Sequence, residues 1–162
     1  MRIDLLGHVD KARLSIQIDI GFGDVVVPGP DNVEYPVLLE DQRTPKLRAY
    51  PKYTVVAEKF EAICKLGMTN SRMKDYFDLY VLLQKGDLDV AKLAEAINAT
   101  LARRQTPKPT GFPTGLTDSF VQDKMKQTQW SAFLKKNDLD EMKLADVVTT
   151  IRARIEETGV FS

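Results

Sequence analysis

The first twenty residues alternate between apolar and polar positions. Between positions 13 and 20 the apolar side chains fall on one side of an extended chain and the polar ones on the other: Leu14, Ile16, Ile18 and Ile20 against Arg13, Ser15, Gln17 and Asp19. This period of two predicts a strand that ends near Asp24, and a shorter strand near residues 3–6 that pairs with it across a turn at 7–11. We therefore expect Asp19 to project from the polar face of a strand.

Residues 25–53 show no helical pattern. Prolines at positions 28, 30, 36, 45 and 51 interrupt any helix there. Two stretches, "YPVLLE" at 35–40 and "KLRAY" at 46–50, are apolar enough for short edge strands. We interpret the region as an ordered connector.

From residue 54 the pattern takes the period of a helix. The first predicted helix spans 55–66, with Thr54 as its N-cap and Gly67 at its C-terminus. A second spans 72–84, begins after Asn70 or Ser71 and ends at Gly86. Three more follow, over 90–104 with Asp89 as the cap, over 121–136 and over 143–157. The fold class is therefore α+β, with a partial sheet and connector at 1–53 and a helical domain at 54–162.

Composition removes several classes of protein. Twenty-three basic residues balance twenty-three acidic ones, so net charge does not favour binding to nucleic acid or to an anionic membrane. One cysteine, Cys64, excludes an internal disulfide, and one histidine, His8, excludes a His-rich metal site. No apolar run approaches the length of a membrane span, and the N-terminus lacks the apolar core of a signal peptide. We expect a cytoplasmic protein.

Three groups of residues could carry chemistry, and each has a purely structural alternative. Asp19 with Asp24 offers the oxygen ligands that magnesium accepts, unless the two are simply a solvated strand face. Lys59, beside Glu58, could meet a phosphate as a point charge, although adjacent Glu and Lys are common on exposed helices.

The third group opens the helix in "NSRMKDYFDLYVL". Arg72, Lys74, Asp75 and Asp78 crowd its first turns, and the spacing of three puts Asp75 and Asp78 on one face. Acidic residues at a helix start also complement the helix dipole, which is the structural alternative. Charges that open an otherwise apolar helix are typical of the rim of a site.

Together, "IQIDIGFGDVVVPGP", "YPKYTVVAEKFEAICKLGMTNSRMKDYFDLYVL" and the "QW..FL" around Trp130 resemble the nucleotidyltransferase AbiEii/AbiGii toxin family, known from bacterial type IV abortive-infection toxin–antitoxin systems. The resemblance implies a polymerase β-like nucleotidyltransferase fold that uses Mg²⁺ to transfer a nucleotide from an NTP to an acceptor. It implies that Asp19 is a catalytic metal ligand and that Lys59 is a catalytic residue that binds the triphosphate. The helix motif with Arg72, Lys74, Asp75 and Asp78 would complete the nucleotide-binding residues.

One family motif is not found. A Gly-Ser followed by Asp-x-Asp should precede the strand of Asp19, and residues 1–18 contain none. We therefore expect the chain to be a C-terminal portion of such an enzyme, with weak or absent binding of Mg²⁺ and NTP and incomplete activity.

Several partners follow from this reading. A strand that has lost its neighbour invites pairing, so we expect a homodimer through the exposed sheet edge. A cognate antitoxin, a missing N-terminal half, or an acceptor such as tRNA are the other partners that the resemblance implies. The alternative is a non-catalytic interaction module, or a partner of a full-length toxin–antitoxin protein, that binds nucleic acid through Arg103, Arg104 and Lys108.

Overall fold

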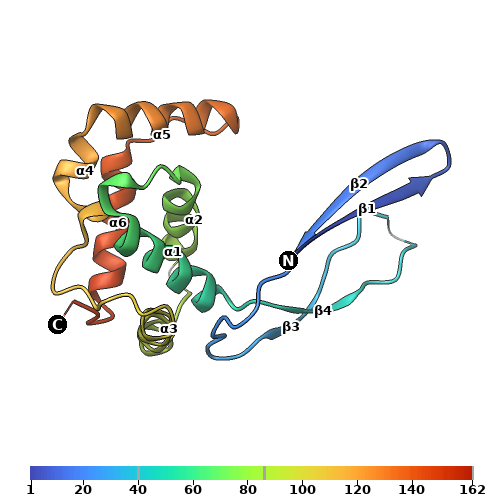
Figure 1. The fold of residues 1–162 in the computed structure, drawn as a ribbon, viewed down its shortest axis with the longest axis horizontal. Coiled ribbons are helices and arrows are strands. Elements are labelled where there is room, and N and C mark those ends of the chain that lie inside the picture. The colour runs from blue at the N-terminus through green and yellow to red at the C-terminus, as the bar shows by residue number, and fades with distance from the viewer. Residues whose placement is uncertain (40, 86, 162) are drawn as a thin grey trace.

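The computed structural model describes residues 1–39, 41–85 and 87–161, and it consists of two β-hairpins followed by helices (Figure 1). Strands β1 (Arg2–Val9) and β2 (Ala12–Asp19) pair antiparallel, with Ile3 opposite Ile18 and Leu5 opposite Ile16. The predicted hairpin is confirmed, but its turn is residues 10–11 and not 7–11, and its second strand ends at Asp19 and not near Asp24. Asp10 takes a positive φ of 51° in the tight turn, a conformation that aspartate tolerates.

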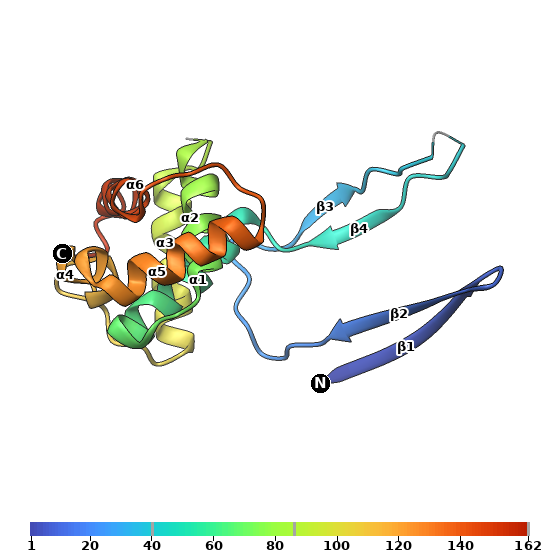
Figure 2. The same cartoon turned by 90° about the horizontal axis from the view of Figure 1, so that it is seen from above.

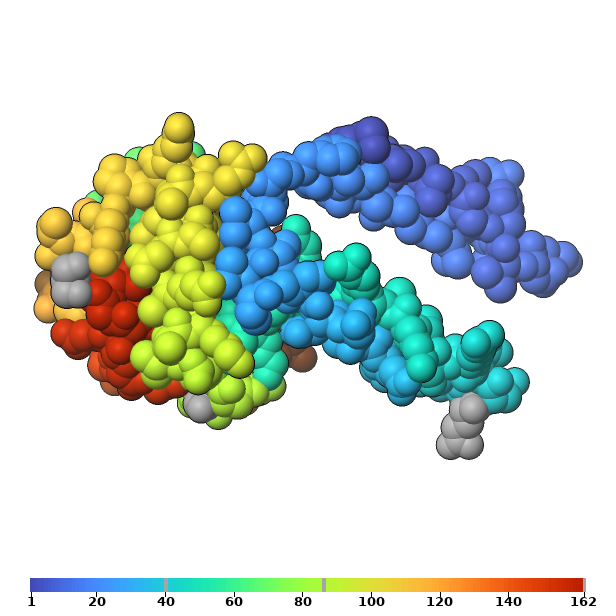
Figure 3. All heavy atoms as spheres, turned by 90° about the horizontal axis from the view of Figure 1, so that it is seen from below, coloured from blue at the N-terminus to red at the C-terminus, as the bar shows by residue number. Residues whose placement is uncertain are grey.

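The apolar face of this hairpin is open. Leu5, Leu14, Ile16 and Ile18 are 47%, 47%, 47% and 41% exposed. The alternation predicted the strand correctly, but no described part of the chain covers that face. Figure 3 shows both hairpins extending away from the helices.

The second hairpin joins β3 (Asp31–Glu34) and β4 (Lys46–Ala49). The predicted strand in "KLRAY" is confirmed. The one in "YPVLLE" is wrong for residues 35–39, since β3 ends at Glu34 and the chain then turns away; Glu40 lies outside the described residues.

Helix α1 (Lys52–Leu66) begins three residues before its predicted start. Pro51 occupies the N-cap position, so Thr54 as N-cap is wrong. Thr54 instead lies inside the helix, where its buried hydroxyl donates to the carbonyl oxygen of Val27 at 3.1 Å. Gly67 ends the helix as predicted, with a φ of 49°.

Helices α2 (Met73–Gln84) and α3 (Val90–Arg103) follow the short helix η1 (Gly67–Thr69). The N-cap position of α2 falls on Arg72, one residue beyond the predicted cap; Asn70 assists by accepting from the Arg72 amide at 2.9 Å. Asp89 caps α3 as predicted, accepting from the Lys92 amide. Gly86 lies outside the described residues.

The predicted helix over 121–136 is two helices. After η2 (Thr114–Leu116), α4 (Asp118–Gln122) ends at Asp123, whose extended backbone and side-chain bond to the Lys126 amide start α5 (Lys124–Lys136). A cap of this kind interrupts one helix and begins the next. The last helix, α6 (Leu144–Glu156), agrees with prediction.

The hydrophobic core is helical. All buried core hydrophobics among the described residues lie between Val56 and Val160, on the helices α1 to α6, on η2 and on the segments beside them. Tyr76 stacks on Phe120 with ring centroids 5.2 Å apart, and its hydroxyl donates to the carbonyl oxygen of Gly115. Figure 2 shows α5 lying across one face of this helical body. The strand-to-helix change at Lys52 fits an α+β fold, while the domain boundary at 53/54 stays a prediction.

Candidate functional site

A hollow of about 510 Å³ lies where the hairpins join the helices. It is bounded by the loop after β2, by α1, by the start of α2 and by the residue that follows α3. Its lining residues are Gly21, Asp24, Tyr50, Val55, Glu58, Lys59, Ala62, Arg72, Asp75 and Arg104. Three cations and three carboxylates therefore face the same space.

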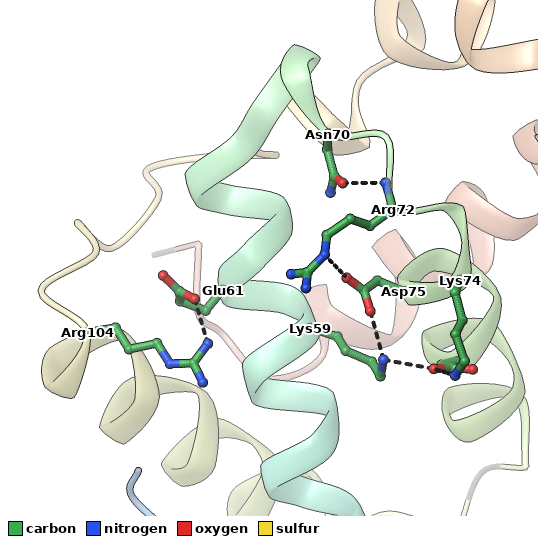
Figure 4. Close-up of polar contacts among 8 residues, drawn as sticks. Lys59, Glu61, Asn70, Arg72, Lys74, Asp75 and Arg104 are labelled. Carbon is green, nitrogen blue, oxygen red and sulfur yellow. Dashed lines mark hydrogen bonds and ion pairs between the residues drawn. The ribbon is translucent and has the colours of Figure 1, made fainter. Parts of the chain in front are cut away.

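Lys59 is held by two carboxylates. Its Nζ lies 2.8 Å from Oδ1 of Asp75 and 2.7 Å from Oδ2 of Asp78, and the three side chains are only 14–22% exposed. The spacing of three places both aspartates on one side of α2, facing α1, as predicted. Figure 4 shows Lys59 and Asp75 meeting between the helices.

The pKa values of Lys59 and Asp78 are shifted toward the charged forms. Burial lowers the pKa of Lys59, but its bonds to Asp75 and Asp78 outweigh burial and leave that pKa raised. Burial likewise raises the pKa of Asp78, and its contacts with Lys59 and Lys74 outweigh it and leave the pKa lowered. The ammonium and the carboxylate are thus both ionised at neutral pH.

Arg72 and Lys74 occupy the rim. Arg72 Nε lies 3.7 Å from Oδ2 of Asp75, and Lys74 pairs with Asp78 one turn along α2. Both cations are largely exposed, at 65% and 72% of their side chains. Of the two, Arg72 lines the hollow.

Arg104 also lines the hollow, although the sequence predicted it only as part of a basic cluster with Arg103 and Lys108. Its guanidinium lies 3.0 Å from Oε2 of Glu61, 3.2 Å from Oε2 of Glu58 and 3.4 Å from Oδ1 of Asp24 (Figure 4 shows the first contact). Glu61 is 3% exposed and also accepts from Thr106. The one sequence signal for this contact of Arg104 was Glu61, a glutamate on the buried side of α1.

The same arrangement fixes the loop after β2. Arg103 Nε donates to the carbonyl oxygen of Gly23 at 2.7 Å, while Arg104 holds the Asp24 carboxylate. Gly23 has a φ of 82°, and a Cβ there would meet Arg103 at 2.7 Å. Arg103 and Arg104 therefore bind this chain's own loop, which occupies two of the three members of the predicted nucleic-acid cluster.

Glu58 carries a perturbed carboxyl group. Burial raises its pKa, the nearby Arg104 opposes this, and Asp24 adds to the rise. The pKa of Glu58 is therefore raised, and this carboxylate takes up a proton at a higher pH than an exposed glutamate does.

Asp19 lies outside the hollow. It ends β2 and forms a two-point contact with Arg2, at 2.7 Å to Nε and 3.0 Å to Nη2, with both side chains at least 60% exposed. The structure thus brings Lys59, Arg72 and Asp75 together at the hollow, with Lys74 and Asp78 beside them, and leaves Asp19 on the hairpin.

In residues 1–39, 41–85 and 87–161, no group of three or more His, Cys, Asp or Glu side chains is placed to hold a metal ion. Asp24 and Glu58 both face the hollow, but Arg104 lies against each of them.

A small sheet region followed by helices, with a lysine fixed by two aspartates beside a hollow lined by charged side chains, defines the class of this α+β protein. A family model described as "Nucleotidyl transferase AbiEii toxin, Type IV TA system" matches residues 2–154. The chain belongs to this family of nucleotidyltransferase toxins. No curated protein matches, and no solved structure matches.

Within the described part of the chain, no helix is both long and apolar enough to cross a bilayer.

Proposed function

We propose that the hollow binds the triphosphate of a nucleoside triphosphate, as the phosphate-holding part of a metal-dependent nucleotidyltransferase. The observation that carries the proposal is the fixed ammonium of Lys59. An ammonium has three donors, and Asp75 and Asp78 take two, which leaves one for a phosphate oxygen. Arg72 lines the same hollow and offers the planar donors that phosphates accept, while Arg104, which also lines it, is paired with Asp24, Glu58 and Glu61.

Binding should depend on magnesium. Asp24, Glu58 and Asp75 also line the hollow, so its cations do not outnumber its carboxylates, and a bare triphosphate would meet repulsion as well as attraction. Mg²⁺ that arrives with the nucleotide neutralises phosphate charge and needs only one or two protein carboxylates. Asp19, assigned to the metal by resemblance, would have to reach the nucleotide from the hairpin.

Among the described residues, three cations line the hollow, whereas no group of three or more His, Cys, Asp or Glu side chains is placed to hold a metal ion. We therefore propose that this chain binds NTP and does not by itself transfer the nucleotide efficiently. An antitoxin is the partner that a member of a type IV toxin–antitoxin family would have, and RNA is the proposed acceptor. The alternative is a non-catalytic module that has kept the helices and lost the nucleotide.

The test is isothermal titration of ATP and GTP, with Mg²⁺ and with EDTA, against the wild type and Lys59→Ala. Loss of a lysine–phosphate contact should weaken binding by about tenfold or more, equal to about 1.4 kcal/mol. Lys65→Ala is the matched control, because Lys65 is an exposed lysine on the same helix and does not line this hollow.

Thermal unfolding of each variant must accompany the titrations, because Lys59→Ala leaves Asp75 and Asp78 without their shared partner. If Lys59→Ala folds and binds nucleotide as the wild type does, or if neither nucleotide binds with Mg²⁺, the module reading replaces this proposal.

A further inference from the structure

Helix α5 carries an exposed surface without carboxylates. Two shallow hollows lie along it: one between α5 and the start of α2, the other on the outer side of α5. No acidic residue lines either of them. The charged residues that line them are Arg72, Lys74, Lys124, Lys135 and Lys136, which we call the α5 basic surface. In a chain with equal numbers of acids and bases, this is a local concentration of positive charge.

Three of the four lysines of α5 make no ion pair with any described residue, while the fourth, Lys126, is buried and donates to the carbonyl oxygen of Asn70. Lys124, Lys135 and Lys136 are exposed, and within the described residues none of them belongs to an ion pair. The carboxylates nearest in sequence lie off the helix: Asp123 caps its start by binding the Lys126 amide, and Asp138 follows its end. The charge of α5 is therefore available to a partner.

Helix stability does not explain the pattern. Lys135 and Lys136 complement the negative end of the helix dipole, but Lys124 stands at the first helical position, where a cation opposes the dipole. Lys124, Thr128, Ser131 and Lys135 follow at spacings of four, three and four, so they form one stripe. The two lysines lie about 16 Å apart along the axis, with hydroxyl groups between them.

This stripe has the chemistry that recognises a phosphodiester backbone. Lysines, together with serine, threonine and glutamine side chains, make most protein contacts to nucleic-acid phosphates. Gln127 and Gln129 also line the two hollows. The one described aromatic residue that lines these two hollows is Phe133, which is half-buried, so contacts with the backbone would dominate over base stacking.

The α5 basic surface is continuous with the nucleotide hollow. Arg72 lines both that hollow and the groove between α2 and α5, and Lys74 and Lys136 line the groove with it. A strand that follows the groove would therefore bring its end to Arg72, at the edge of the hollow. Figure 2 shows α5 running across one face of the helical body.

We propose that the α5 basic surface binds the phosphate backbone of a nucleic-acid strand and directs its end toward the Lys59 hollow. Only the strand's role as an acceptor rests on the proposed function; the binding itself does not. RNA and DNA share the phosphate chemistry, and the experiment distinguishes them.

The experiment measures fluorescence anisotropy of labelled single-stranded RNA and DNA of the same length, over a range of salt concentrations. The test variant combines Lys124→Gln, Lys135→Gln and Lys136→Gln. The matched control combines Lys11→Gln, Lys85→Gln and Lys92→Gln, which removes the same charge from exposed lysines elsewhere. We expect the test variant to bind at least tenfold more weakly and the control to bind as the wild type does.

The salt dependence gives a second readout. Each lysine–phosphate contact to a single strand contributes about 0.7 to the slope of log K against log salt, so losing three should reduce that slope by about 2. An equal loss in both triple variants, or no binding by the wild type, would overturn the proposal. So would competition by poly-glutamate as strong as that by unlabelled RNA, because it would identify an acidic protein as the partner.

Lys59→Ala keeps the two proposals apart. It should lose nucleotide while keeping the strand, whereas the α5 triple variant should do the reverse. Strand binding without any NTP binding would sustain this inference and end the proposed function.

Discussion

A mostly buried cluster of three charges stands out at the level of single residues: Lys59, Asp75 and Asp78. The ammonium bridges two carboxylates that belong to successive positions on one side of a neighbouring helix. Sequence could place Asp75 and Asp78 together by their spacing, because a helix repeats every 3.6 residues. It could not show that Lys59 meets both, because that contact depends on how α1 and α2 pack.

The pKa of Asp78 gives a pH prediction. Its folded pKa lies below the ordinary value of about 3.9, so its stabilising contribution is present above pH 4 and is lost as pH falls through the folded pKa. The pKa of Lys59 is raised, so the stabilising contribution of its ammonium is lost only at strongly alkaline pH. Asp78→Asn should destabilise the protein at pH 7, and the gap from wild type should shrink below pH 4.

Urea unfolding of both proteins at several pH values measures this gap. A difference that is the same at pH 7 and at pH 3 would mean that the charge of Asp78 contributes nothing to stability.

Arg104 joins three elements: it follows α3, contacts two glutamates of α1 and holds the loop after β2. Arg104→Met should cost about 2 to 4 kcal/mol of unfolding free energy, because Glu61 would remain buried with only Thr106 as a partner. Chemical denaturation measures the loss.

A double variant distinguishes charge from shape at this junction. Glu61→Leu combined with Arg104→Met removes both buried charges, and it should recover much of the lost stability. If the double variant is as unstable as the sum of the two single ones, the contact between Arg104 and Glu61 is not the source of the effect.

At the level of elements, the helices and their approximate positions could be predicted from the sequence, because apolar spacing determines which face of a helix packs inward. The errors fall where side chains act on the backbone. Asp123 divides one predicted helix in two, because it caps the start of α5. Thr54 does not cap α1, because its hydroxyl donates to the carbonyl oxygen of Val27, which is distant in sequence. The role of Arg104 was missed for a related reason, since contacts between residues 24, 58, 61 and 104 arise only on folding.

The open face of the β1–β2 hairpin has a consequence for the whole molecule. A two-stranded hairpin is only marginally stable in water, and this one leaves Leu5, Leu14, Ile16 and Ile18 uncovered. We propose that two copies associate through this hairpin, by its edge or its apolar face. Sedimentation velocity from low to high micromolar protein should show a growing dimer.

Ile16→Lys should abolish that dimer, because it places a charge in the centre of the apolar face. Gln17→Lys adds the same charge to the opposite face and serves as the control. A wild type that stays monomeric at all concentrations would remove the hairpin from any interface, and a dimer that survives Ile16→Lys would remove its apolar face.

The confinement of the core to residues 56–160 decides what a stability measurement can report. The denaturant dependence of unfolding scales with the surface that unfolding exposes, and here that surface belongs to the helices, about two thirds of the chain. Heat or urea therefore registers the loss of the helical body and passes over the first fifty residues. A protein with an intact melting curve can still have lost its hairpins, so their condition has to be followed by amide hydrogen exchange at those residues.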